Sequence, residues 1–228
     1  SGVRHMPEWD VYEGLNTRLG ASVRPFELPG QYDRKRMRSM GRVAMLATRS
    51  SELAMEDAGL LGDPVLTSGK TGVAYGSSSG SPIALSQLAS MMLTKNTDSV
   101  KANSYIQMMS HTTAVNVSVF FGICGRLIPT SSACTSGSLA IGEAYEAIRY
   151  GKQTVMIAGG AEEISPSQAA VFDTLFATST RNDTPTETPS PFDADRDGMV
   201  IGEGAATVVL EEMEHAQARG AHIHAEVI

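Results

Sequence analysis

The sequence has little cysteine, no long apolar run and no excess of positive charge. Its two cysteines in 228 residues are too few for a disulfide framework, which indicates reduced thiols. No apolar run approaches the roughly 18 residues of a membrane span, and the chain does not open on the apolar segment of a signal peptide. A net charge of −7 argues against general nucleic-acid binding. These absences predict a soluble, cytoplasmic protein whose partners are neither membranes nor nucleic acids.

The length and the apolar patterning predict one compact α/β unit. No internal repeat, low-complexity tract or charged linker divides the chain. Short apolar runs alternate with longer segments of helical spacing, which indicates a mostly parallel sheet covered by helices on both faces. The predicted strands are 71–76, 127–130, 154–159, 205–210 and 222–228. The predicted helices are 33–58, which Asp33 begins and Gly59 ends, 82–93, 106–121, 135–150, 167–176 and 212–218.

Residues 178–198 form a long polar loop, and loops of this length in a compact domain are usually functional or interfacial. Asp193, Asp195 and Asp197, followed by Gly198, fit the first half of a calcium-binding loop. The twelfth position of that pattern is Gly204, however, so the bidentate glutamate is missing. A hydrogen-bonded turn is therefore the favoured interpretation.

Cys134 stands where a predicted strand runs through a turn of small residues into an amphipathic helix. The positive end of a helix and its free N–H groups favour thiolate over thiol, which would make this cysteine a nucleophile. The backbone N–H of Cys134 would stabilise an oxyanion on a thioester carbonyl, and small neighbours such as Ala133 leave room for an acyl chain. A buried structural cysteine is the alternative, and the residues alone leave both interpretations open.

Four ordered motifs resemble one family. They are Thr130-Ser131-Ser132-Ala133-Cys134, Gly76-Ser77-Ser78-Ser79-Gly80-Ser81, Ala158-Gly159-Gly160-Ala161-Glu162-Glu163, and the stretch from Pro191-Phe192-Asp193 through Arg196-Asp197-Gly198 to Gly202-Glu203-Gly204-Ala205. Together they resemble the β-ketoacyl-acyl-carrier-protein synthases, elongating condensing enzymes of the thiolase superfamily. The resemblance implies a thiolase-like fold, of which this chain would hold the N-terminal βαβαβ-type half. Segments 6–9 and 105–116 further resemble the bacterial aryl-polyene ketosynthase branch.

The resemblance implies a 3-oxoacyl-acyl-carrier-protein synthase, an acyltransferase of fatty-acid or aryl-polyene type synthesis. In that family the cysteine, here Cys134, takes an acyl group from a carrier protein. A malonyl carrier protein then loses carbon dioxide, and its carbanion attacks the acyl-enzyme in a decarboxylative Claisen condensation. The two histidines and the lysine that support this second step in the family's second half have no counterpart in residues 1–228. We therefore expect 1–228 to be an N-terminal ketosynthase half that lacks the family's first strand and is inactive in condensation by itself.

Two alternatives to the ketosynthase interpretation stay open. A coenzyme-A-dependent thiolase shares the fold and the nucleophile. A truncated, non-catalytic subunit of a ketosynthase heterodimer shares the fold alone. A chain-length factor should lack the cysteine, so Cys134 argues against that form of the second alternative.

Arg34, Lys35, Arg38 and Arg42 lie on one stripe of the predicted helix 33–58. Cations at a helix start oppose the helix dipole, which suggests a binding purpose, although an ordinary solvated face is the alternative. In the family this region docks the acidic acyl carrier protein. The resemblance extends that role to these residues, with Lys95 completing the patch.

The predicted helix 106–121 begins with Ile106, Met108 and Met109. Core packing is the default for such residues, but methionines also line pockets for flexible acyl chains. The resemblance implies that this helix lies at a dimer interface, with Ile106, Met109 and Ala133 as substrate contacts and Met109 reaching the partner subunit's acyl tunnel. The expected assembly is a homodimer or a ketosynthase/chain-length-factor heterodimer.

The other candidate residues favour structural roles. His111 is more simply part of a helix start than a catalytic base. His222, His224 and Glu226 share one face of the predicted strand, a spacing that could hold zinc, but a half-buried strand shows the same alternation. Cys124 is expected to pack in the interior. No metal and no organic cofactor is expected.

Overall fold

The computed structural model describes residues 2–228, and the chain divides into two compact units. The smaller unit holds the residues up to Phe26 together with Glu163–Gly204, and the larger holds Glu27–Glu162 together with Ala205–Ile228. The prediction of one unit is therefore wrong. No charged linker or low-complexity tract marks the crossings between the units, and the sequence analysis did not detect the division.

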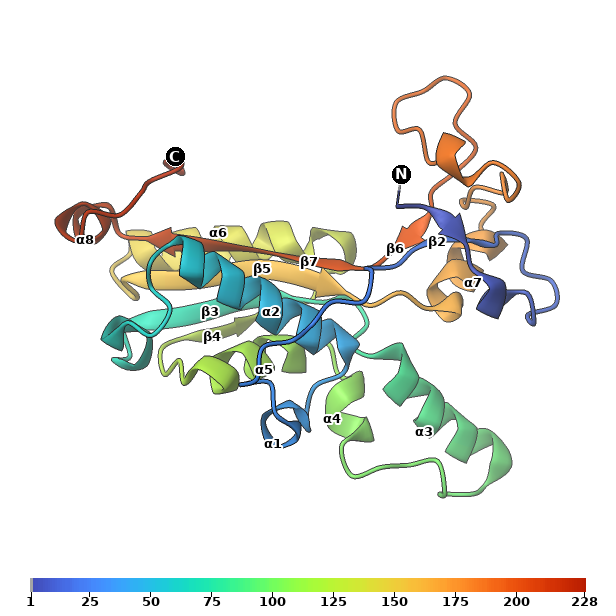
Figure 1. Ribbon diagram of the computed structural model, residues 1–228, viewed down its shortest axis with the longest axis horizontal. Coiled ribbons are helices and arrows are strands. Elements are labelled where there is room, and N and C mark those ends of the chain that lie inside the picture. Colours follow the sequence, from blue (N-terminus) through green and yellow to red (C-terminus); the bar gives the residue numbers. More distant parts are fainter. Residues whose placement is uncertain (1) are drawn as a thin grey trace. The chain divides into compact units, whose positions relative to one another are not determined.

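The larger unit is built on a four-stranded sheet in the order β4-β3-β5-β7. Its strands are β3 (Thr71–Gly76), β4 (Leu127–Pro129), β5 (Val155–Glu162) and β7 (Gly204–Glu211). β3 pairs in parallel with β4 and with β5. β7 runs opposite to β5, as the arrows of Figure 1 show, and the N–H of Glu212 closes that pair by donating to the carbonyl of Thr154 at 2.9 Å. The sheet is thus mostly parallel, as predicted.

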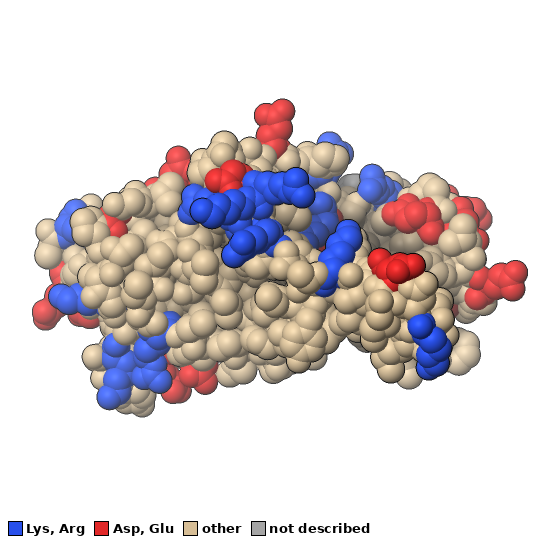
Figure 2. All heavy atoms as spheres, turned by 90° about the horizontal axis from the view of Figure 1, so that it is seen from below, with Lys and Arg blue, Asp and Glu red and all other residues tan. Residues whose placement is uncertain are grey.

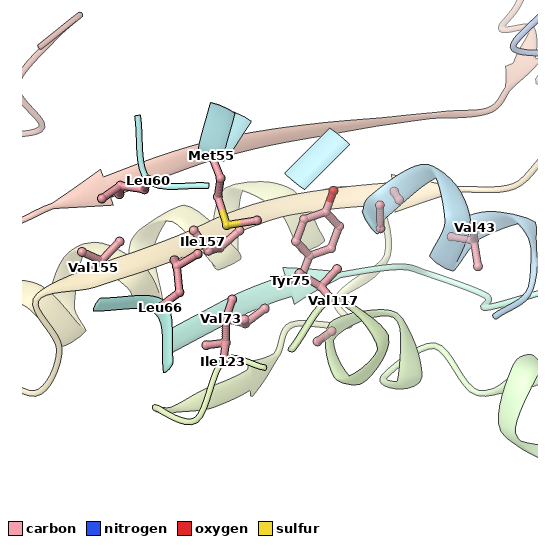
Figure 3. Packing of buried hydrophobic residues seen from close by; sticks show 13 residues of the cluster. Val43, Met55, Leu60, Leu66, Val73, Tyr75, Val117, Ile123, Val155 and Ile157 are labelled. Atoms are coloured by element: carbon pink, nitrogen blue, oxygen red, sulfur yellow. The ribbon is translucent and has the colours of Figure 1, made fainter. Parts of the chain in front are cut away.

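Helices cover both faces of this sheet. They are α2 (Arg42–Asp57) and α5 (Thr112–Phe121) on one face and α6 (Ser136–Arg149) on the other. Successive strand residues point to opposite faces, so Val73 and Tyr75 join the large cluster with α2 and α5 shown in Figure 3, whereas Ala74 faces α6. The α6 side of the core is made largely of alanine, and small side chains let a helix lie close to its sheet.

Two predicted helices are each broken in two. The segment 33–58 forms α1 (Arg34–Met37) and α2, and the segment 106–121 forms α4 (Ser104–Met108) and α5. Gly41 interrupts the first in extended geometry, packed so closely that a Cβ there would lie 2.5 Å from the Cβ of Ser81. Met109 interrupts the second with a ψ of 125°. As predicted, Asp33 caps the first helix, accepting from the N–H of Arg36 at 2.9 Å.

The larger unit has further elements besides this sheet and the helices named above. They are η2 (Pro64–Thr67), α3 (Pro82–Thr94), η3 (Ala133–Thr135) and α8 (Met213–Ala218). The predicted strand 222–228 does not form, and these residues are irregular and exposed. Within residues 2–228 no neighbouring strand pairs with them, and an unpaired strand has no partner for its backbone groups.

The smaller unit has a three-stranded sheet of its own in the order β1-β2-β6. Its elements are β1 (Arg4–His5), η1 (Pro7–Trp9), β2 (Leu19–Ala21), α7 (Pro166–Thr174), η4 (Pro185–Glu187) and β6 (Ile201–Gly202). Met6, Trp9, Leu15 and Ala169 form its buried core. Gly20 lies tightly against this core, because a Cβ there would lie 2.8 Å from the side chain of Met6.

The acidic loop of the smaller unit forms a hydrogen-bonded turn, the favoured interpretation of its sequence. Asp193 Oδ1 accepts from the N–H of Asp195 at 2.8 Å, and Asp197 Oδ2 accepts from the Ser179 hydroxyl and from the N–H of Thr180 at 3.0 Å each. Among residues 2–228, no three His, Cys, Asp or Glu side chains cluster as a metal site would require. None of the helices in that range is long and apolar enough to cross a membrane.

Candidate active site

The turn after β4 carries Cys134. The chain leaves β4 at Pro129, passes through the one-turn helix η3 and enters α6 at Ser136. Ala133 has a φ of 53°, a left-handed conformation that costs a residue with a Cβ about 1 kcal/mol or more. Parallel strands end at this edge of the sheet, where α/β proteins commonly bind their ligands.

Ser136 holds this strained turn in place. Its buried hydroxyl donates to the carbonyl of Ala133 at 2.6 Å and accepts from the N–H of Ser132 at 2.9 Å. The hydroxyl of Thr130 donates to the carbonyl of Ser136 at 3.0 Å. The conformation that presents Cys134 is therefore fixed by side chains on both sides of it.

The thiol of Cys134 is exposed, so the alternative of a buried structural cysteine is wrong. Cys134 lies in η3, directly before the 14-residue helix α6, which agrees with the predicted position at a helix start. Within residues 2–228 no group accepts a hydrogen bond from its backbone N–H. A free N–H beside an exposed thiol is the arrangement that an oxyanion requires.

The glycines of the two neighbouring strands bring the sheet against this turn. A Cβ on Gly76, the last residue of β3, would lie 2.3 Å from the carbonyl oxygen of Thr130. A Cβ on Gly160 of β5 would lie 3.2 Å from the Cα of Gly137 in α6. These glycines belong to two of the four sequence motifs, and their shared role is close approach of backbone to backbone.

The serine-rich motif after β3 is tied to the end of β5. Glu162 accepts from the N–H of Ser78 at 2.8 Å and from the hydroxyl of Ser79 at 2.8 Å. A Cβ on Gly80, whose φ is 65°, would lie 2.3 Å from the carbonyl oxygen of Met108, so the motif also touches α4. The motifs that contain Ser78 and Glu162 thus meet in the fold.

The candidate acyl contacts lie at the corner between α4 and α5. Ile106 is exposed on α4, and Met109 is half-buried where α4 ends. The hydroxyl of Thr112 bridges them, donating to the carbonyls of Ile106 at 2.8 Å and of Met109 at 2.7 Å. Ser131 donates to Ser110 at 3.0 Å, which joins this corner to the turn that carries Ala133 and Cys134.

The candidate docking residues have different surroundings. Arg34, Lys35 and Arg38 are exposed on and after α1, Arg42 is half-buried on α2, and Lys95 is exposed at the C-terminal end of α3. Figure 2, seen from the side on which α1 lies in Figure 1, shows Lys and Arg side chains gathered near the middle of this face.

Arg36, the neighbouring basic residue, has a structural role. Its guanidinium lies 3.9 Å from the centre of the Phe120 ring and donates to the Phe120 carbonyl. This contact fixes α1 against α5 and engages the Arg36 guanidinium, so Arg36 is not counted among the docking residues.

The other candidates are not assembled into a site. His111 is exposed at the start of α5 and makes no capping bond with its side chain. The rings of His222 and His224 contact each other edge to face, with their centres 4.6 Å apart, although no strand forms there. His224 Nε2 lies 3.0 Å from a carboxylate oxygen of Asp57. Cys124 is exposed in the irregular connection between α5 and β4, so its predicted packing role is wrong.

A family model described as the N-terminal domain of β-ketoacyl synthase matches residues 1–216. The chain belongs to the β-ketoacyl synthase family. A curated relative, 3-oxoacyl-[acyl-carrier-protein] synthase 1 of Haemophilus influenzae, is 38% identical over an alignment of 234 positions that covers 100% of this chain and 56% of the relative. The chain therefore spans about half the length of that relative.

Solved structures of other ketosynthases share the fold. A β-ketoacyl synthase of Burkholderia phymatum is 60% identical with a TM-score of 0.95, over 98% of this chain and 55% of that one. A ketosynthase structure described as a type II PKS acyl-carrier protein in complex with its ketosynthase bound to the hexaketide is 28% identical with a TM-score of 0.80, over 98% of this chain and 54% of that one. The predicted thiolase-like α/β fold of this ketosynthase chain is confirmed.

Sequence reasoning missed the residues that support the site. Ser136 lies two residues after the motif that ends at Cys134, and nothing in the sequence pattern indicated that it holds Ala133. Gln107 and Asn103 gave no signal, because their contacts are to backbone carbonyls far away in the sequence.

Proposed function

We propose that this chain is the N-terminal half of a 3-oxoacyl-acyl-carrier-protein synthase in which Cys134 is the nucleophile. The observation that carries the proposal is the exposed Cys134 thiol with its free backbone N–H, held by a strained turn before α6. Strained backbone that the surroundings hold in place is typical of catalytic turns.

The proposed chemistry has two stages. The Cys134 thiolate attacks the carbonyl of an acyl thioester, the Cys134 N–H stabilises the oxyanion, and the carrier's thiolate leaves and takes up a proton. A malonyl carrier then loses carbon dioxide, and its enolate carbon attacks the acyl group on Cys134. The new carbon–carbon bond expels the cysteine thiolate and leaves a 3-oxoacyl carrier.

The second stage needs donors that stabilise the enolate, which the family resemblance assigns to two histidines in a second half. We therefore propose that residues 1–228 form the N-terminal half of a longer protein and supply the acylation stage. On this proposal, the complete protein condenses acyl and malonyl units, whereas 1–228 alone does not.

The proposed partner for both stages is an acyl carrier protein. Arg34, Lys35 and Arg38 are exposed cations on a chain whose net charge is −7, so they reverse the local sign of the surface. Such a reversal suits an acidic partner. The related complex of a ketosynthase with an acyl-carrier protein supports this choice, and Arg42 and Lys95 extend the proposed patch.

The proposed acyl contacts are Ile106, Met109 and Ala133, with Met109 serving the partner subunit's tunnel in a homodimer or in a heterodimer with a chain-length factor. Exposure of Ile106 at the surface of the described chain supports a role in contact with another molecule. Aryl-polyene type synthesis is the proposed pathway, on the likeness of segments 6–9 and 105–116, with fatty-acid synthesis as the alternative.

Acylation of Cys134 tests the nucleophile directly. The complete protein is incubated with an acyl carrier thioester, and its intact mass and peptide masses are measured. We expect one acyl adduct on Cys134, none in Cys134→Ala, and full labelling in Cys124→Ser, which removes the other exposed thiol. Absence of an adduct on Cys134 in the wild type, or labelling of Cys124 instead, would contradict the proposal.

The same assay separates the enzyme alternatives. A thiolase would accept the acyl group from coenzyme A at least as well as from a carrier protein, whereas the proposed enzyme prefers the carrier. A non-catalytic subunit would take an acyl group from neither.

A further inference from the structure

The linker between α1 and α2, residues 38–41, is held by side chains from two other helices. Gln107 Nε2 on α4 donates to the Met40 carbonyl at 3.0 Å and to the Arg38 carbonyl at 3.3 Å. Asn103 Nδ2 donates to the same Arg38 carbonyl at 2.6 Å. The hydroxyl of Ser39 donates to Asn116 of α5 at 2.7 Å.

Gln107 uses both of its side-chain donors in this position. A primary amide has two N–H donors, and those of Gln107 meet the linker carbonyls of Arg38 and Met40, two residues apart. Its backbone carbonyl in turn accepts from the N–H of Ser81 at 3.0 Å. Gln107 therefore joins the linker, α4 and the serine-rich motif in one set of bonds.

The two sides of this contact carry different proposed roles. Arg38, whose carbonyl is held, presents its exposed side chain to the proposed carrier protein. Of the proposed acyl contacts, Ile106 directly precedes Gln107 on α4, a helix of only five residues, and Met109 lies where that helix ends. Because so short a helix is not stable by itself, its position depends on such tertiary contacts.

We propose that Gln107 is a positioning residue that fixes Arg38, a carrier-docking residue, against α4 and the adjoining Met109. Carrier recognition and acyl-chain selection then depend on one set of hydrogen bonds. This inference rests on the function proposed above. Gln107 touches neither the reacting atoms nor, on this proposal, the carrier.

The test is Gln107→Glu in the complete protein, which keeps the side chain's shape but replaces both donors by a carboxylate facing two carbonyls. We expect the KM for acyl carrier protein to rise about tenfold, because the two hydrogen bonds to the linker carbonyls are lost and the carboxylate repels those oxygens. We also expect the preferred acyl length to broaden across carriers loaded with short to long chains. The rate of Cys134 acylation by a small carrier-free thioester should stay within about twofold of wild type.

Gln217→Glu is the matched control, since Gln217 is exposed on α8 and far in sequence from both roles. It makes the same change of charge and should leave all three readouts unchanged. If Gln107→Glu does not fold at the assay temperature, Asn103→Ala replaces it, with an expected threefold rise in the carrier KM from loss of one bond to the same carbonyl.

The inference is overturned if folded Gln107→Glu has an unchanged carrier KM and acyl range. It is also overturned if the variant loses as much activity with the carrier-free thioester as with the carrier protein. Failure of the proposed function gives a different result, because then even the wild type shows no adduct on Cys134.

Discussion

The hydroxyl of Ser136 donates to the carbonyl of Ala133 at 2.6 Å, across the turn that carries Cys134. The same hydroxyl accepts from the N–H of Ser132, so one buried side chain closes the turn from both ends. These two hydrogen bonds maintain the left-handed φ of Ala133.

Ser136→Ala should therefore loosen the nucleophile turn. We expect a loss of about 1–3 kcal/mol in the free energy of unfolding, because the turn loses both hydrogen bonds of the Ser136 hydroxyl. We also expect slower acylation of Cys134, measured by intact mass over time. Ser138→Ala, at an exposed position two residues further along α6, is the control and should be neutral. Equal stability and equal acylation rates in the two variants would remove the role given to Ser136.

Gly76→Ala and Gly137→Ala compare two glycines beside the same turn. A Cβ on Gly76 meets backbone at 2.3 Å, whereas a Cβ on Gly137 meets its nearest atom at 3.9 Å, an ordinary contact. Gly76→Ala should cost about 1–3 kcal/mol or prevent folding, while Gly137→Ala should be neutral or slightly stabilising within α6. Urea unfolding followed by circular dichroism measures both. Similar losses in the two variants would show that proximity to the turn, rather than backbone contact, decides the effect.

Stability should fall at acid pH through Asp173. Burial opposes ionisation of this carboxyl, but hydrogen bonds from Asn16, from Thr178 and from the N–H of Thr17 outweigh it and lower the pKa of Asp173 below its usual 3.8. A lowered folded pKa contributes stability that is present above the unfolded pKa and lost as pH falls through the folded value.

Asp173→Asn should accordingly lose about 1–3 kcal/mol near neutral pH and show a smaller further loss below pH about 4 than the wild type. Urea unfolding at several pH values measures this, with Asp183→Asn, at an exposed position of the same unit, as control. If the free energy of unfolding of Asp173→Asn depends on pH as that of the wild type does, this prediction is wrong.

Charge reversal separates docking cations from structural ones. Lys35→Glu and Arg38→Glu should raise the KM for acyl carrier protein about tenfold and leave the melting temperature unchanged, because both side chains are exposed. Added salt should weaken carrier binding to the wild type more than to these variants. Lys152→Glu, exposed before β5, serves as control.

Arg36→Ala should have the opposite effects on stability and on the carrier KM. It lowers stability through the lost contact with Phe120 and leaves the carrier KM nearly unchanged. A raised KM without loss of stability would place Arg36 among the docking residues.

Much of the larger unit follows from local pattern. β3 is predicted with its observed bounds because six successive buried residues lie between turn residues, and Cys134 is correctly expected at a helix start. The breaks at Gly41 and Met109 could not be predicted, since Gly41 packs against Ser81 and the backbone of Met109 packs against Gly80, and both partners are distant in sequence. The strand expected at 222–228 had the right alternation but finds no partner in the described chain.

The smaller unit could not be foreseen as a unit at all. Its core joins Trp9 and Leu15 to Ala169, and its sheet pairs Gly20 with Ile201. Apolar periodicity reports which residues are buried, but not which distant residue buries them.

That pairing has a consequence for synthesis of the chain on the ribosome. Met6, Trp9 and Leu15 are made before the larger unit, yet the segment that covers them begins only at Glu163. These apolar side chains stay uncovered while the larger unit's β3, β4 and β5 are made, which at ordinary elongation rates lasts on the order of ten seconds. This apolar segment thus has much to gain from a chaperone, and no single cut in the polypeptide would release either unit intact.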